Sequence, residues 1–108
     1  MVSSFEWKYL QELRRLDPTV RVALLADSRP DEALLYASEL RAIGVHLKAG
    51  LITPARVAHA QARGLGILAW TVDDPAEMQR LADLEVDAIV SNRPARLRDV
   101  LTGRRGKM

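Results

Sequence analysis

Short apolar runs alternate with segments of helical periodicity along the whole chain, and this alternation constrains the fold more than any other feature. The runs are rich in Val, Ile and Leu, as expected for parallel strands that are buried on both faces. Repeated strand–helix units with short connections predict right-handed βαβ units and a parallel sheet. The five predicted strands are residues 1–5, 20–26, 43–47, 65–72 and 86–90.

The segments between these runs carry helix start and stop signals. Thr53-Pro54 and Asp74-Pro75 each place a capping side chain before a proline at the first helical position. Asp17-Pro18 stops the first helix, and Gly64 ends the third. The five predicted helices begin at Glu6, Pro30, Pro54, Pro75 and Ala95, and Gly103 closes the last one.

Composition limits the chain to one small domain and excludes several kinds of chemistry. With 108 residues, 48% of them hydrophobic, the chain can bury a core. It has no cysteine, which excludes disulfides, thiolate metal sites and cysteine nucleophiles. No apolar run approaches the ~18 residues of a membrane span, and the first residues do not resemble a signal peptide. We therefore expect a cytoplasmic protein.

The charge excess lies at the end of the chain. The net charge is +2, and residues 103–108 hold three basic side chains after the last apolar residue. We expect a domain over residues 1–102 followed by a basic flexible tail. No basic stripe with interleaved aromatic residues is present, so we predict no nucleic-acid partner.

Four motifs carry a resemblance to one family. Ser3-Ser4-Phe5-Glu6 is similar to its SSF strand end, and Val45-His46-Leu47 to a later strand that ends in His or Asn. Trp70-Thr71-Val72-Asp73 is similar to its WTVN strand end, and residues 86–94 to its GVDGIITDRP segment. In this order, from residue 2 to about 101, the chain resembles the carboxyl half of bacterial cytoplasmic glycerophosphodiester phosphodiesterases.

The resemblance implies an α/β fold in which parallel βαβ repeats form half of a TIM (β/α)8 barrel, with about five strand–helix units. Such barrels need about 250 residues, so the chain supplies a little under half and begins as if inside a fold. The implied activity of the complete domain is hydrolysis of glycerophosphodiesters to an alcohol and glycerol 3-phosphate. Mg or Ca is the implied cofactor, and lipid metabolism the implied setting.

The family's catalytic motifs are missing from this sequence, which has no His-Arg-Gly and no His-Asp. Glu85-Val86-Asp87 has the ExD form of its metal motif but precedes the last predicted strand, so Asp87 is interpreted as a structural residue. Asp27 follows a strand but is a weak ligand by itself. We therefore assign no catalytic residue and no metal ligand, and expect the chain alone to be inactive.

Trp70, Phe5, Ser4 and His46 are the predicted substrate-binding residues. The resemblance implies that Trp70 and Phe5 line the substrate mouth. Ser4 would hydrogen-bond a ligand oxygen or cap the following helix. His46 lies near the carboxyl end of a strand, where both packing and pocket lining stay open. His59 falls in mid-helix, and we expect it outside the barrel.

Three positions depart from the family pattern. Asn92 stands where the family usually has Asp, and Asp73 where it has Asn, and both replacements keep the ability to cap a turn. Glu85 replaces a Gly that often takes a positive φ, so we expect backbone strain at Glu85 or a different turn.

Two alternatives from other functional classes remain open. The first is a non-catalytic half-barrel that self-associates or pairs with another half to cover its open edges and inner face. The second is a small flavodoxin-like α/β binding domain, although no glycine-rich phosphate loop follows any strand. Helices on one face of the sheet favour the half-barrel, whereas helices on both faces favour the binding domain.

Overall fold

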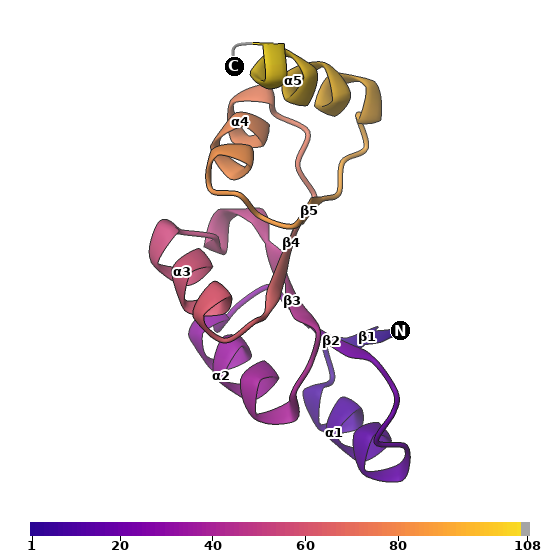
Figure 1. The fold of residues 1–108 in the computed structure, drawn as a ribbon. Coiled ribbons are helices and arrows are strands. Elements are labelled where there is room, and N and C mark those ends of the chain that lie inside the picture. The colour runs from indigo at the N-terminus through magenta and orange to yellow at the C-terminus, as the bar shows by residue number, and fades with distance from the viewer. Residues whose placement is uncertain (107–108) are drawn as a thin grey trace.

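The structure is a computed structural model that describes residues 1–106, which form a parallel sheet covered by helices (Figure 1). No helix among these residues is both long enough and apolar enough to cross a membrane. The elements in chain order are β1 (Val2–Ser4), α1 (Trp7–Leu16), β2 (Val22–Ala26), α2 (Pro30–Leu40), β3 (Gly44–Lys48), the 3-10 helix η1 (Ala49–Leu51), α3 (Pro54–Ala62), β4 (Gly66–Trp70), α4 (Pro75–Asp83), β5 (Ala88–Ile89) and α5 (Pro94–Gly106).

The strands lie in the sheet in the order of the sequence, β1-β2-β3-β4-β5, and every neighbouring pair is parallel. The units together form an arc, with α1 to α4 following its outer side and the strands its inner side (Figure 1). A flavodoxin-like sheet has the order 2-1-3-4-5. The observed order differs from a flavodoxin-like sheet and confirms the prediction of consecutive βαβ units, as in an open (β/α) barrel.

One face of the sheet is buried beneath the helices. Alternate strand residues share a face, and in β2, β3 and β4 those that face the helices are 2% exposed or less. Leucines of α1, α2 and α4 complete this core. The strand residues of the core are Val22, Leu24, Val45, Leu47, Ile67 and Ala69.

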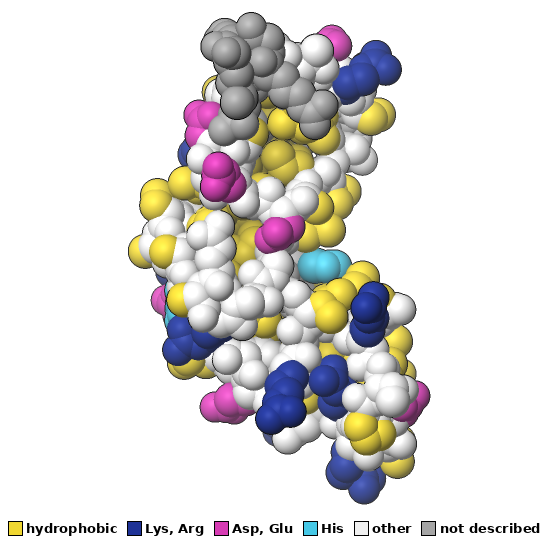
Figure 2. All heavy atoms as spheres, in the orientation of Figure 1, with side chains coloured by type: hydrophobic (Ala, Val, Ile, Leu, Met, Phe, Trp, Pro, Cys, Tyr) yellow, Lys and Arg dark blue, Asp and Glu magenta, His cyan; other side chains and the backbone are white. Residues whose placement is uncertain are grey.

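The other face of the sheet is open and hollowed. Leu25, His46, Leu68 and Trp70 occupy the alternate positions and are only half-buried. Figure 2 shows hydrophobic side chains and a histidine along the inner side of the arc. The sheet therefore has one apolar face that is buried beneath the helices and one face that stays partly exposed.

Three helix-to-strand turns share one geometry, in which a single residue adopts the left-handed conformation. These residues are Arg41 (φ 56°), Gly64 (φ 69°) and Glu85 (φ 60°). The next backbone N–H then donates to a carbonyl five residues back, which is the Schellman pattern. The three bonds run from Ala42 to Ala37 at 2.9 Å, from Leu65 to Ala60 at 2.9 Å and from Val86 to Leu81 at 3.4 Å. Glu85 thus has the positive φ of the glycine that it replaces, and the strain of this conformation stays a prediction.

Asp87 joins β4 to β5 at the amino edge of the sheet. Its Oδ2 accepts a hydrogen bond from the backbone N–H of Ile67 at 2.7 Å, and its own N–H donates to the Ile67 carbonyl at 2.9 Å. These bonds support its interpretation as a structural residue, because the carboxylate is used at the edge opposite to the one where barrel ligands bind.

Two boundaries differ from the predictions. β5 has two residues, although the apolar run predicted five. α5 continues through Gly103 to Gly106, because an internal glycine costs a helix only about 1 kcal/mol. Residues 107–108 of the predicted tail lie outside the described residues, and the flexibility of that tail stays a prediction.

Glu85→Gly is expected to raise the free energy of unfolding by about 0.5–1 kcal/mol, because glycine has no Cβ to oppose the left-handed conformation. Urea denaturation measures the change. The matched control is Glu39→Gly, inside α2, which is expected to lower the same free energy by about 1 kcal/mol. Destabilisation by both substitutions would show that Glu85 is not strained.

Candidate functional site

Phe5 and Trp70 meet at the carboxyl edge of the sheet, and Trp70 reaches the backbone of His46 in the middle of β3. The rings of Phe5 and Trp70 form an edge-to-face pair, with centroids 6.1 Å apart and planes at 84°. The Trp70 Nε1–H donates to the carbonyl oxygen of His46 at 3.1 Å. The structure thus brings the side chains of Phe5 and Trp70 together and joins Trp70 to the backbone of His46, whose side chain lies on the same face of the sheet.

The contact between Phe5 and Trp70 measures the curvature of the sheet. Phe5 follows β1 and Trp70 ends β4, so in a flat sheet their strands would stand about 14 Å apart. Their rings nevertheless touch across β2 and β3. This contact agrees with the arc of Figure 1, in which the sheet curls toward its open face and makes that face a concave wall.

Asp73 and Asp74 hold the turn that follows Trp70. Asp74 caps α4, since its Oδ2 accepts from the backbone N–H of Glu77 at 3.1 Å. Asp73 accepts from the N–H of Asn92 at 2.8 Å and from Ser91 Oγ at 3.0 Å. These bonds, led by the one from the Asn92 backbone, lower the pKa of the Asp73 carboxyl. Asp73 therefore fastens the turn after β4 to the turn after β5.

His46 lies on the concave face, where its surroundings favour the neutral imidazole. It lies in the middle of β3, in register with Leu25 on one side and Leu68 on the other. Burial among these neighbours lowers the pKa of the imidazole below its usual value. A neutral imidazole has one donor and one acceptor nitrogen, so it can hydrogen-bond a hydroxyl or a phosphate oxygen.

Ser4 does not join the other three residues. It pairs in register with Leu24, which faces the helical core. Its Oγ accepts a hydrogen bond from the backbone N–H of Glu6 at 2.9 Å. Of its two predicted roles, the one with a contact in the structure is capping the turn before α1.

Lys48 is a candidate that the sequence reasoning missed. It ends β3, is exposed, and lies in register beside Trp70. Alternation along the strand from His46 to Lys48 places both residues on the open face. That alternation was the signal that could have found it. Its ammonium group is the kind of partner that a phosphate oxygen needs.

The remaining candidates do not form a metal site. Asp27 follows β2, and His59 lies on α3, on the helical side of the sheet. Within residues 1–106 no group of three or more His, Asp or Glu side chains could hold a metal ion. The Mg or Ca implied by the resemblance therefore does not fit the residues present, and no reaction step is derived through it.

Comparisons with known proteins agree on one family. The model of the glycerophosphoryl diester phosphodiesterase family matches residues 1–96. Probable glycerophosphodiester phosphodiesterase 2 of Mycobacterium tuberculosis is 50% identical over 54 residues, which are 50% of this chain and 20% of that protein. The glycerophosphodiester phosphodiesterase of Caldanaerobacter subterraneus subsp. tengcongensis is 27% identical over 97 residues, which are 90% and 40% of the two chains.

A solved structure gives the same result for the fold. The crystal structure of a glycerophosphodiester phosphodiesterase from Parabacteroides distasonis superposes with a TM-score of 0.80 at 27% identity. The match covers 94% of this chain and 42% of that one. The chain spans 40% or less of the length of the curated relatives named above.

Stability is expected to fall as the pH drops from about 7.5 to about 5.5, because the folded chain resists protonation of His46. The usual pKa of histidine is about 6.5, so below that pH the unfolded chain binds more protons than the folded one. His46→Gln should remove this part of the pH dependence, as measured by urea unfolding at both pH values. His59→Gln is the matched control and retains it. An unchanged slope in His46→Gln would refute the prediction.

Proposed function

Since this chain belongs to the glycerophosphoryl diester phosphodiesterase family, we propose that it forms one wall of a site for glycerophosphodiester hydrolysis. The observation that supports this proposal is the cluster of Phe5, His46 and Trp70 on a concave face. Ligands of (β/α) barrels bind at the carboxyl edge of the strands, where Phe5 and Trp70 lie, and His46 lies on the same face in the middle of β3.

The residues of this wall suit the parts of such a substrate. Phe5 and Trp70 offer apolar surface to the carbon atoms of the glycerol and alcohol groups. The neutral imidazole of His46 would hydrogen-bond a hydroxyl or ester oxygen, and Lys48 would offset the negative charge of the phosphate. In this proposal all four residues bind and orient the substrate, and none of them carries out the reaction.

The chemistry itself requires groups that these residues do not supply. Hydrolysis of a phosphodiester uses a general acid, a general base and a group that stabilises charge on the phosphoryl oxygens. The chain has two histidines; His46 lies on the open face, whereas His59 lies on α3 on the other side. They are not placed to act as an acid–base pair, so we propose that the chain by itself is inactive.

A complete site would take its catalytic groups, and the Mg or Ca expected for the family, from the remainder of a family domain. In the Caldanaerobacter protein, that remainder is the 60% of the sequence that this chain does not match. We further propose that the complete protein acts in lipid and glycerophosphodiester metabolism. Its proposed compartment is the cytoplasm, which a chain without cysteine suits.

The test is a hybrid protein in which this chain replaces the matched 40% of the Caldanaerobacter protein. With Mg or Ca present, the hybrid is expected to release glycerol 3-phosphate from glycerophosphocholine, whereas the 108-residue chain alone releases none. In the hybrid, Trp70→Ala should raise KM about tenfold or more, because it removes one apolar wall of the binding site.

Two results would contradict the proposal. Hydrolysis by the chain alone would show that its own residues suffice for catalysis. A folded hybrid without activity would show that this wall does not serve a phosphodiesterase. Exchange of Leu16, an exposed leucine of α1, for Ala is the matched control and should leave KM unchanged.

The exposed apolar side chains of the open face favour a second candidate, a non-catalytic half-barrel that associates with itself. Phe5 is 53% exposed and Val90 is 44% exposed, and β1 and β5 are edge strands. Association of two copies through this face would cover surface that isolated proteins seldom expose.

Light scattering over a range of concentrations tests this candidate. The unsubstituted chain is expected to form dimers or larger particles, and Val90→Asp to shift it toward monomers, because a charge resists burial in an apolar interface. Leu16→Asp changes an exposed leucine on the helical side and should have no effect. A monomer at all concentrations would eliminate the candidate.

A further inference from the structure

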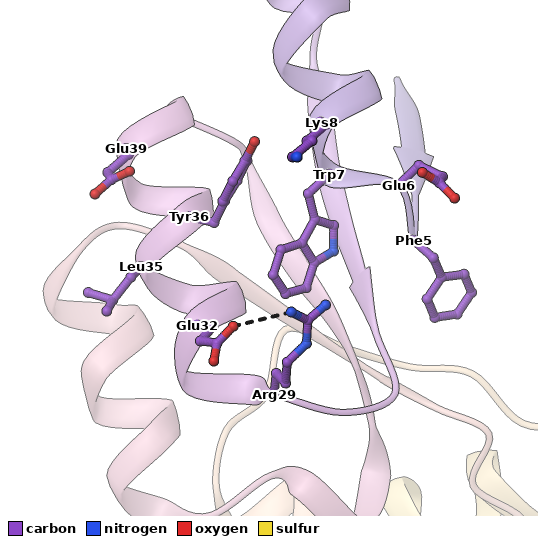
Figure 3. Close-up of a pocket in the computed structure, with 9 residues that line it drawn as sticks. All are labelled: Phe5, Glu6, Trp7, Lys8, Arg29, Glu32, Leu35, Tyr36 and Glu39. Carbon is purple, nitrogen blue, oxygen red and sulfur yellow. Dashed lines mark hydrogen bonds and ion pairs between the residues drawn. The ribbon is translucent and has the colours of Figure 1, made fainter.

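A groove between α1 and α2 combines two aromatic rings with acidic side chains (Figure 3). It has a volume of about 600 Å3. Trp7 projects from α1 and Tyr36 from α2, with ring centroids 5.6 Å apart and planes at 48°. This chain therefore supplies both walls of the groove, one from α1 and one from α2.

Hydrogen bonds at their polar ends hold the two rings in place. The Trp7 Nε1–H donates to the carbonyl oxygen of Leu25 at 3.0 Å, and the Tyr36 hydroxyl donates to Gln11 Oε1 at 2.7 Å. Each ring is thus fixed by an atom at its edge. The faces of aromatic rings carry negative potential and attract cations.

The groove already holds one cation from the chain itself. The guanidinium carbon of Arg29 lies 5.1 Å from the centroid of the Trp7 ring, and Arg29 Nη1 lies 3.3 Å from Glu32 Oε2. The Arg29 side chain is 64% exposed, so it can move into solvent without breaking buried contacts. Three carboxylates, Glu6, Glu32 and Glu39, line the groove against two cations, Lys8 and Arg29.

We propose that this groove is a binding site for a quaternary ammonium ion, which displaces the Arg29 guanidinium from the face of Trp7. A quaternary ammonium group is bulky and weakly hydrated, and it gains more from aromatic faces than from hydrogen bonds. The Glu32 carboxylate, released from Arg29, then balances the charge of the ligand. The groove shares Phe5 with the wall proposed for hydrolysis. The proposal nevertheless does not rest on the proposed hydrolysis, because the paired rings of Trp7 and Tyr36 belong to helices on the outer side of the sheet.

Tryptophan fluorescence of the 108-residue chain tests the site, with choline as the probe. The chain has two tryptophans, so Trp70→Phe leaves Trp7 as the only reporter. Choline is expected to change the emission of Trp7 in a saturable way at constant ionic strength. The uncharged compound of the same shape, 3,3-dimethylbutan-1-ol, should not. Calorimetric titration of the unsubstituted chain gives a second readout that does not depend on Trp70→Phe, and Trp7→Leu should abolish its binding heat.

Variants then assign the role of each charged group. Arg29→Ala should tighten choline binding by about threefold, because it removes a competing exposed cation. In the Arg29→Ala background, Glu32→Gln should weaken binding by about threefold, because the ligand loses its counter-charge. Glu12→Gln in the same background is the matched control, since Glu12 pairs with Arg15 at the same three-residue spacing but does not line the groove. It should leave binding unchanged.

Three results would overturn the proposal. The first is the lack of saturable choline binding by folded Arg29→Ala protein in both measurements. The second is an equal response to the uncharged alcohol, which would mean that the groove recognises apolar shape and not charge. The third is weaker binding after Arg29→Ala, which would mean that Arg29 does not compete with the ligand.

Discussion

The burial of one face of the parallel sheet beneath its crossover helices is the constraint on which the rest of the structure depends. Every right-handed crossover returns on the same side, so all strands turn the same set of side chains toward the helices. Val45, Leu47 and Ile67 are buried there, and their alternate neighbours are left on the other face. The candidate binding wall is therefore a by-product of how the core is built, because His46 and Trp70 occupy positions that the core does not use.

Much of the fold could be predicted from the sequence, because hydrophobic periodicity and capping signals are local. The number, order and type of units follow from the alternation of runs, and Thr53 and Asp74 cap helices as predicted. The length of β5 could not be predicted, because pairing depends on the neighbouring strand and not on how apolar the run is. The end of α5 was also missed, since Gly103 is a stop signal only when the chain turns there.

The candidate site was only partly predictable, because the position of a residue along its strand decides which face of the sheet its side chain occupies. Phe5 and Trp70 are paired at the carboxyl edge, whereas His46, expected near the carboxyl end of its strand, lies in the middle of β3. Ser4 was expected with them, but a shift of one residue along a strand turns a side chain to the opposite face. Alternation from His46 could have placed Lys48 on the open face, but its position beside Trp70 follows only from the register of β3 and β4. The pairing of Trp7 with Tyr36 depends on how two helices are rotated toward each other, which hydrophobic patterns do not specify.

The contact between Phe5 and Trp70 also concerns how a barrel of this kind can close. Four neighbouring strands already bend enough to bring these rings together, and the units superpose on a longer solved chain with a TM-score of 0.80. The bend is thus a property of adjacent units and does not require the ring to be complete. Further strands that pair with β1 or β5 would join a sheet that is already curved. A barrel would then close by the addition of strands, without a change in the shape of these five.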